Sequence, residues 1–288
     1  MMSFAPELAE STDPYRNYCL WPYAPIASTV GAWRPVNLLR HSFEVAGAGA
    51  PHERLVERLR ENLGIHAVVW GVKFVGGRLS WEFYFYDYER RERTVSLSRV
   101  LPIFQGTPAD ILSIDERIPY FMFSLDLEDS VLSRASTVEH AHIYIGNPTG
   151  NLSSGISYGL TRAGMRLENV YTFFDARRDL EGAAAKAACS AYFDSESVPI
   201  DEILIPELVD CDSICVANKS THDTVYFSGV TTDQLIHFME RFGYPAPIVE
   251  FVTAHRSRFA PLLHDVGFDY RCDGTRIEVL KSGYYGVF

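Results

Sequence analysis

The stretch Arg78-Leu-Ser-Trp-Glu-Phe-Tyr-Phe-Tyr86 alternates between two kinds of side chain. Successive side chains of a β-strand point to opposite faces, so the alternation predicts one apolar face and one polar, tyrosine-rich face. The apolar face carries Trp81, Phe83 and Phe85, and the other carries Ser80, Glu82, Tyr84 and Tyr86. An apolar face of this kind suits a cover of helices. The second face is too bulky and aromatic to be solvent surface alone.

Turn signals divide most of the remaining chain into five hairpins. The expected strand pairs are residues 68–74 with 78–88, 120–126 with 138–145, 155–160 with 166–174, 213–217 with 224–228, and 267–270 with 276–281. Asp273-Gly274 is the strongest of the turn signals. Short turns imply antiparallel pairing, because parallel strands need long crossover connections.

Ten such strands can form a closed barrel or an open sheet with helices on one side. The strand at 140–145 repeats the alternation, with His140, His142 and Tyr144 against Ala141, Ile143 and Ile145. An open sheet would leave the tyrosine-rich face exposed, whereas a barrel wider than eight strands can enclose a furnished cavity. We therefore expect an α+β fold, a ten-stranded antiparallel barrel with helices outside and the active site in the lumen.

Helices are expected at residues 51–63, 179–192, 232–242 and 248–259, from apolar spacing, caps and terminating Gly or Pro. Residues 1–50 are rich in Pro, Ala and Gly and are expected to form an irregular lead-in packed on the barrel. Residues 51–288 would form the barrel itself, as a single domain.

The 288-residue chain has 26 basic and 37 acidic residues, a net charge of −11. A protein that follows nucleic-acid phosphates is usually basic, so no nucleic-acid partner is expected. No apolar run reaches the roughly 18 residues that span a bilayer, and the N-terminus lacks the pattern of a secretory signal. Five cysteines without framework spacing suit a reducing compartment. These features predict a cytoplasmic globular protein with no membrane partner.

Several common catalytic motifs are absent from the sequence, namely a phosphate-binding loop, His-Glu-x-x-His, Cys-x-x-Cys and Asp-Asp-x-x-Asp. His140-x-His142 could bind a metal, because alternate residues of a strand share a face. No third ligand lies nearby in sequence, so we interpret the pair as hydrogen-bonded lumen histidines and expect no metal held directly by protein side chains.

Three stretches resemble the cyanobactin-type peptide prenyltransferases, within the broader ABBA aromatic prenyltransferase fold. Phe123–Leu127 followed by Glu139–Ile145 is similar to the family's third and fourth strands, which place a histidine at the position of His142. Residues 213–235 are similar to the fourth hairpin and the helix after it. Thr275–Tyr285 is similar to the last strand, where a basic residue matches Lys281 and tyrosines follow. The likeness extends from residue 51 to the end.

The resemblance implies transfer of an isoprenyl group from an allylic diphosphate, such as dimethylallyl or geranyl diphosphate, with Mg²⁺ accompanying the diphosphate. Cations would hold the leaving group and aromatic faces would shield the allyl cation. The lumen candidates for the diphosphate are Lys73, His142, Arg162 and Lys281. The candidates for cation shielding and phenol hydrogen bonds are Tyr144, Tyr171, Tyr226 and Tyr285. Each of these residues could instead have a structural role in the barrel.

The sequence departs from the family's pattern at the position of the catalytic base. The peptide-modifying family has a glutamate on its first strand, and Val69 stands near that position here. Glu82 could replace it as the catalytic base, or could equally pair with Lys73. Gly159 and Gly283 lie in or beside strands and are expected to line an apolar floor that limits prenyl length.

The acceptor is open at this stage. A linear or macrocyclic peptide is the first reading, a small aromatic metabolite the second, and a non-catalytic barrel that binds an apolar ligand the third. A wide barrel mouth would favour a peptide and a capped lumen a small molecule. A non-catalytic barrel that binds an apolar ligand would not need Lys73, Arg162 and Lys281 together in its lumen. Prenyl length, regiochemistry, oligomeric state and the acceptor group (Tyr, Trp, His, Arg or a terminus) are not specified by the sequence.

Overall fold

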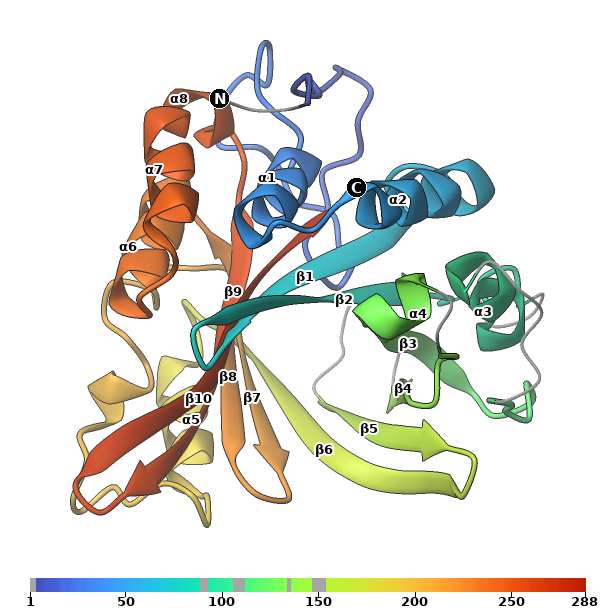
Figure 1. The fold of residues 1–288 in the computed structure, drawn as a ribbon. Helices are drawn as coiled ribbons and strands as arrows, with labels where there is room; N and C mark the ends of the chain where they lie inside the picture. The colour runs from blue at the N-terminus through green and yellow to red at the C-terminus, as the bar shows by residue number, and fades with distance from the viewer. Residues whose placement is uncertain (1–3, 89–92, 106–111, 134–135, 147–153) are drawn as a thin grey trace.

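The computed structural model describes residues 4–88, 93–105, 112–133, 136–146 and 154–288. Ten strands form one closed antiparallel barrel (Figure 1), in which each strand pairs with its neighbours in chain order and β1 pairs with β10. The strands are β1 (Val68–Val75), β2 (Arg78–Tyr86), β3 (Tyr120–Leu127), β4 (Ala141–Gly146), β5 (Ser154–Thr161), β6 (Gly164–Asp175), β7 (Ser213–Lys219), β8 (Asp223–Val230), β9 (His264–Asp273) and β10 (Arg276–Val287). The predicted ten-stranded barrel is confirmed.

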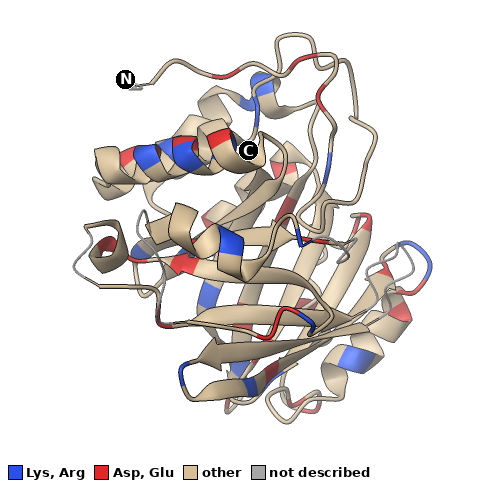
Figure 2. Ribbon diagram, turned by 90° about the vertical axis from the view of Figure 1, so that its right-hand side faces the viewer, with Lys and Arg blue, Asp and Glu red and all other residues tan. Residues whose placement is uncertain are grey.

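Helices surround the barrel on its outside (Figure 1). They are α1 (Val36–Ala46), α2 (Ala50–Leu63), α3 (Leu97–Gln105), α4 (Asp129–Leu132), α5 (Leu180–Ala188), α6 (Thr232–Arg241), α7 (Ala246–Ala254) and α8 (Arg256–Phe259), with a 3₁₀ turn at Ile200–Glu202. None of the helices in the described ranges has the length and apolar character needed to cross a membrane. Acidic and basic residues lie interspersed along the helices, strands and loops (Figure 2).

The two faces of β2 behave as the alternation predicts. Trp81, Phe83 and Phe85 point outward into the core beneath the helices, and the indole N–H of Trp81 donates a 2.8 Å hydrogen bond to Ser42 Oγ on α1. Tyr84 and Tyr86 belong to a separate cluster inside the barrel. The barrel therefore has an apolar outer layer and a chemically distinct lumen.

The expectation of an irregular lead-in is wrong for residues 36–46, which form α1. Val36, Leu39 and Phe43 recur at helical spacing and are buried, and Gly47 closes the helix with a left-handed backbone (φ 68°). The Pro, Ala and Gly of the surrounding segment obscured this short amphipathic pattern. The helix α3 was also missed, because Pro102 stands inside it. The strand β10 runs to Val287 instead of ending at residue 281, because its last residues pair with β1.

Residues 4–35 have no helix or extended strand, and part of this segment packs on the barrel. The segment 18–21, which we call the cap segment, enters one end of the lumen: Tyr18, Leu20 and Trp21 pack on the inner aromatic cluster. The hydroxyl of Tyr86 donates to the carbonyl of Tyr18, and that of Tyr88 donates to the carbonyl of Cys19. The lead-in thus contributes directly to the lumen.

Glycines inside the barrel make room for tyrosine rings. A Cβ built at Gly267 would lie 2.4 Å from Cδ1 of Tyr226, and one at Gly71 would lie 2.8 Å from Cε1 of Tyr285. Such distances are far below van der Waals contact, so these strand positions accept no larger residue without moving a buried ring.

Replacing Gly267 by Ala should lower the free energy of unfolding by about 1–3 kcal/mol, because the added methyl group overpacks the Tyr226 ring. Urea unfolding of the purified variant would measure the change. Gly155→Ala is the matched control, since the nearest atom to a Cβ there is Ile145 O at 3.7 Å. Equal stability of the two variants would contradict the packing argument.

Candidate functional site

Charged side chains that face the lumen gather at the end of the barrel where the β1–β2, β5–β6, β7–β8 and β9–β10 turns lie. We call this set the charged layer. It comprises Lys73, Glu82, Asp126, His142, Glu168, Lys219, Asp269 and Lys281. The strand register explains the gathering, because each residue occupies an inward position near a turn or strand end.

One half of the charged layer is acidic. Lys73 Nζ lies 2.8 Å from Glu82 Oε2 and also pairs with Asp126, and Glu82 accepts a hydrogen bond from Ser124. His142 Nδ1 lies 2.6 Å from Glu168 Oε2, and its Nε2 lies 3.9 Å from Asp126. Three carboxylates therefore surround one ammonium group and one imidazole.

The protonation state of His142 follows from the carboxylates that surround it. Burial alone would lower the pKa of His142, but the neighbouring carboxylates of Asp126 and Glu168 raise it to about 9. Burial likewise opposes ionisation of Glu168, yet contacts with His140 and His142 lower its pKa to about 2. At neutral pH His142 is therefore an imidazolium between two carboxylates.

The other half of the charged layer is cationic. Lys219 and Lys281 share one carboxylate, each with Nζ 3.1 Å from Asp269 Oδ2. Thr224 donates to the same carboxylate at 2.6 Å, and His222 Nε2 lies 3.0 Å from it. Burial lowers the pKa of Lys219 to about 8, and the neighbouring Lys281 adds to the lowering although Asp269 opposes it. Positive charge here exceeds what Asp269 compensates, which is the condition for binding an anion.

Five tyrosines form an aromatic layer next to the charged layer. The ring centroids are 6.0 Å apart for Tyr84 and Tyr285, 6.1 Å for Tyr226 and Tyr285, and 6.0 Å for Tyr144 and Tyr171. Burial raises the pKa of all five phenols, so they are neutral hydrogen-bond donors. With the cap segment, they line a cavity whose empty volume, its opening included, is ≈ 580 Å³.

Asp265 ties the cap segment to the barrel wall. Its carboxylate accepts a 2.8 Å hydrogen bond from the backbone N–H of Tyr18 and another from the hydroxyl of Ser228. Burial raises the pKa of Asp265 to about 6. The attachment of the cap therefore includes a carboxyl group whose ionisation is costly.

The structure places most of the sequence-predicted site residues in the lumen. Lys73, Glu82, His142 and Lys281 lie in the charged layer, and Tyr144, Tyr171, Tyr226 and Tyr285 lie in the aromatic layer. Arg162 is the exception: it occupies the exposed turn between β5 and β6, because β5 ends at Thr161. The expectation that Arg162 faces the lumen is wrong.

The glycine predictions differ in outcome. Gly159 faces the lumen within the charged layer, where a Cβ would lie 2.2 Å from Glu168 Oε1 and 2.8 Å from His140 Nε2. Its neighbours are ionic, so Gly159 is not part of an apolar floor. Gly283 lies beside the hydroxyl of Tyr285, 3.1 Å from its Cβ position, between the two layers. A role of Gly283 in chain length stays a prediction.

The expected base role of Glu82 does not fit its surroundings. Although burial would raise its pKa, the ammonium group of Lys73 holds it below the ordinary value. A buried carboxylate already paired with Lys73 and Ser124 is a weak proton acceptor. Of the two readings of Glu82, the geometry favours the partner of Lys73.

Sequence reasoning missed Asp126, Glu168, Lys219, Asp269 and Tyr18. Lys219 continues the inward-facing positions of β7 two residues beyond Ala217, so a longer strand assignment would have found it. Asp269 lies inside the expected strand at 267–270, two residues after Gly267 on the inward face, but was not singled out. Glu168 escaped because a β-bulge opposite Ser157 and Tyr158 breaks the alternation of β6. Tyr18 lies in a segment with no periodic pattern.

The architecture is an antiparallel ten-stranded barrel with outer helices. No family model matches the sequence, and no curated protein matches it. Among solved structures, the chain is similar to 5-dimethylallyl tryptophan synthase from Streptomyces coelicolor, crystallised in complex with DMASPP and Trp. The identity is 12%, the match covers 94% of this chain and 95% of the other, and the TM-score is 0.52. The fold is therefore that of the prenyltransferase barrel.

Asp265 should give the protein a distinctive pH dependence of stability. Its pKa rises from 3.8 to about 6 on folding. The folded state thus binds this proton more tightly, so the resulting stabilisation is present below pH about 4 and is lost as pH rises through about 6. The amount is about 3 kcal/mol, at about 1.4 kcal/mol per pKa unit.

Comparison of wild type with Asp265→Asn isolates this contribution from other titrating groups. The wild-type free energy of unfolding minus that of the variant, from urea titrations at pH 4.5 and pH 7, should fall by about 2 kcal/mol as pH rises. A difference that is the same at both pH values would refute the assignment.

Proposed function

We propose that this protein transfers an isoprenyl group from an allylic diphosphate to a small aromatic acceptor inside the barrel. The observation that carries the proposal is the order of the lumen: a charged layer with a cationic half, then an aromatic layer, then the cap segment. This order matches an amphiphile with an anionic head and an unsaturated apolar tail. The similar solved structure, a dimethylallyl tryptophan synthase, supports the same reaction type.

The diphosphate would bind at the cationic half. Lys219 and Lys281 offer two ammonium groups that share the carboxylate of Asp269, and hydrogen bonds to ionised groups are the strong ones in such sites. Because these lysines are held in place before the substrate arrives, they can stabilise charge on the leaving diphosphate without reorganising. Lys73 is already engaged by Glu82 and Asp126 and serves chiefly to hold the acidic half together.

The carboxylates of the acidic half indicate whether the diphosphate binds alone or as a magnesium complex. A bare diphosphate would be repelled by Glu82, Asp126 and Glu168, whereas a magnesium diphosphate carries less negative charge. Mg²⁺ is commonly bound through substrate phosphates and one or two carboxylates, and the partly exposed carboxylate of Asp126 could supply one of them. The residues therefore fit a magnesium-complexed diphosphate as the substrate.

The aromatic layer would protect the reacting carbon. As the allylic C–O bond breaks, its electron pair leaves with the diphosphate and an allyl cation forms. Tyrosine faces around this position stabilise the cation by cation–π attraction and exclude water. A carbon of the acceptor ring then attacks, and the ring proton passes to the released diphosphate. Glu82 needs no part in this step, because an electron-rich ring requires little help from a base.

The cap segment favours a small acceptor over a peptide. Tyr18 and Cys19 line the aromatic cavity, and the cap is hydrogen-bonded to Tyr86, Tyr88 and Asp265. A peptide would have to displace this segment or enter through the charged layer.

Mass spectrometry tests the proposal directly. The protein is incubated with Mg²⁺, dimethylallyl or geranyl diphosphate, and either free aromatic metabolites, including tryptophan, or peptides containing Tyr, Trp, His or Arg. We expect a prenyl adduct on a free aromatic compound. If adducts formed only on peptides, the acceptor would be a cyanobactin-like peptide instead of the small aromatic compound proposed here. Tight binding of prenyl compounds without any adduct would instead indicate a non-catalytic barrel.

Lys281→Gln should raise the KM for the prenyl diphosphate about tenfold to a hundredfold, because one charge-assisted hydrogen bond is worth about 1.5–3 kcal/mol. Steady-state kinetics at saturating acceptor would measure it. Arg162→Gln is the matched control and should leave KM unchanged, since Arg162 lies in an exposed turn. If Lys281→Gln left both KM and the rate unaltered, the proposal that the cationic half binds the diphosphate would be rejected.

A further inference from the structure

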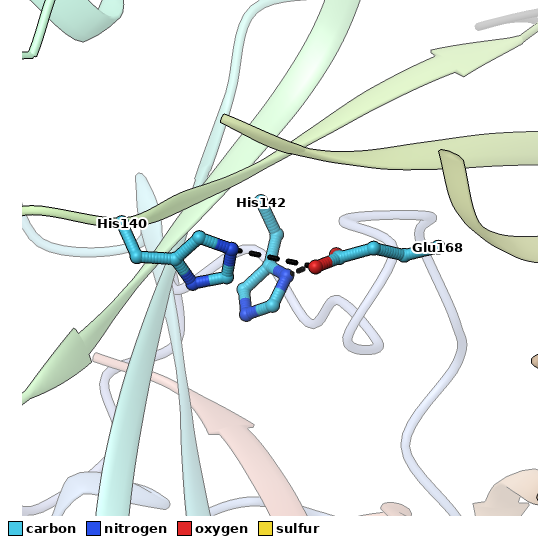
Figure 3. Close-up of side chains that lie close together, drawn as sticks. All are labelled: His140, His142 and Glu168. Carbon is cyan, nitrogen blue, oxygen red and sulfur yellow. Dashed lines mark hydrogen bonds and ion pairs between the residues drawn. The ribbon is translucent and has the colours of Figure 1, made fainter. Parts of the chain in front are cut away.

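Two histidines and a glutamate converge at the acidic half of the charged layer (Figure 3). His140 Nε2 lies 3.3 Å from Glu168 Oε1, and His142 Nδ1 lies 2.6 Å from Glu168 Oε2. One ligand atom from each of the three residues can be chosen so that all lie within 4.8 Å of one another. The side chains are between 22% and 41% exposed, so an ion could reach them from solvent.

Two features of the backbone build this convergence. The β-bulge in β6 leaves Glu168 as the extra residue between Leu167 and Asn169, so Glu168 turns inward next to Asn169. Gly159 pairs with His142 across β4 and β5 and leaves the space that the carboxylate fills. The bulge and the glycine both weaken the strands in which they lie. Together they bring one carboxylate against two imidazoles.

We infer that His140, His142 and Glu168 form a binding site for a transition metal ion, with Zn²⁺ as the best fit. Two imidazole nitrogens and one carboxylate oxygen are the donor set of an open three-ligand zinc site, which keeps a position for a further ligand. Mg²⁺ prefers oxygen ligands alone, so this site is separate from the magnesium that would accompany the substrate.

The bound ion would change the charge of the acidic half. Two positive charges beside Asp126 and Glu82 would offset the carboxylate excess there. The site also borders the cationic half, because Lys219 pairs in register with Asn169, the residue after Glu168. On the basis of the proposed function, the free position on the metal takes an oxygen of the diphosphate, alongside Lys219.

Metal titration of the full-length protein, first stripped with a chelator, tests the site. Isothermal titration with Zn²⁺, and Co²⁺ absorption as a report of coordination, should give one ion per chain. His140→Ala and Glu168→Gln should each weaken binding about 100-fold or more, with circular dichroism checking that the variants fold. His222→Ala is the matched control and should bind normally, because His222 contacts the carboxylate of Asp269 and is not one of the three converging residues.

The outcomes separate this inference from the proposed function. Absence of saturable Zn²⁺ and Co²⁺ binding, or binding that His140→Ala and Glu168→Gln leave intact, would overturn the metal site. The anion role is measured with inorganic diphosphate on zinc-loaded protein freed of excess metal: about tenfold tighter binding than to the metal-free protein is expected, and equal affinity would reject that role. Stoichiometric zinc binding without prenyl transfer would reject the proposed function and leave the metal site standing.

Discussion

The pairing of β1 with β10 is the constraint on which the rest of the molecule depends. It joins Val69 to Val287 and places Lys73 beside Gly283 and Gly71 beside Tyr285. Only after the last strand closes the ring do inward side chains of all ten strands face a common space. The charged and aromatic layers are therefore properties of the complete fold, and the glycines beside the tyrosines are required because closure brings rings and backbone together.

Closure also creates an electrostatic problem, because charged groups are brought into a space with little water. Taking charges out of water costs several kcal/mol per ion, and a buried pair often recovers no more than this cost. Lys73 with Glu82 and Asp126, and Asp269 with Lys219 and Lys281, are thus poorly explained as sources of stability. They are better explained as fixed charges that are in position before a ligand arrives. Because these charges are divided unequally into an acidic and a cationic half, the lumen is electrostatically polarised, which a neutral packed core would not be.

The two-residue period of β2 was enough to predict the barrel and the inward tyrosines, because a closed sheet makes alternation decide which face a residue takes. The same rule placed Lys73, Glu82, His142 and Lys281 in the lumen. It failed where the backbone departs from the period or where a strand was assigned too short. Arg162 lies past the end of β5, Lys219 lies beyond the expected end of β7, and the bulge at Glu168 reverses the face of one residue. The helix α1 was hidden by the composition around it, and the position of the cap segment depends on long-range hydrogen bonds that no local pattern encodes.

The bulge in β6 connects the layers of the lumen. It turns two consecutive residues inward, Glu168 toward His140 and His142, and Asn169 toward Tyr171 and Ser157, to each of which its amide donates a 2.8 Å hydrogen bond. One local distortion thus fixes a carboxylate in the charged layer and orients a phenol of the aromatic layer. Under the proposed function, the head of an allylic diphosphate stays near the hairpin turns while its tail reaches past Asn169 toward the tyrosines. The diphosphate and the allyl cation then lie in separate layers, and the tyrosine faces keep water from the cation, which transfer to an acceptor, rather than to water, requires.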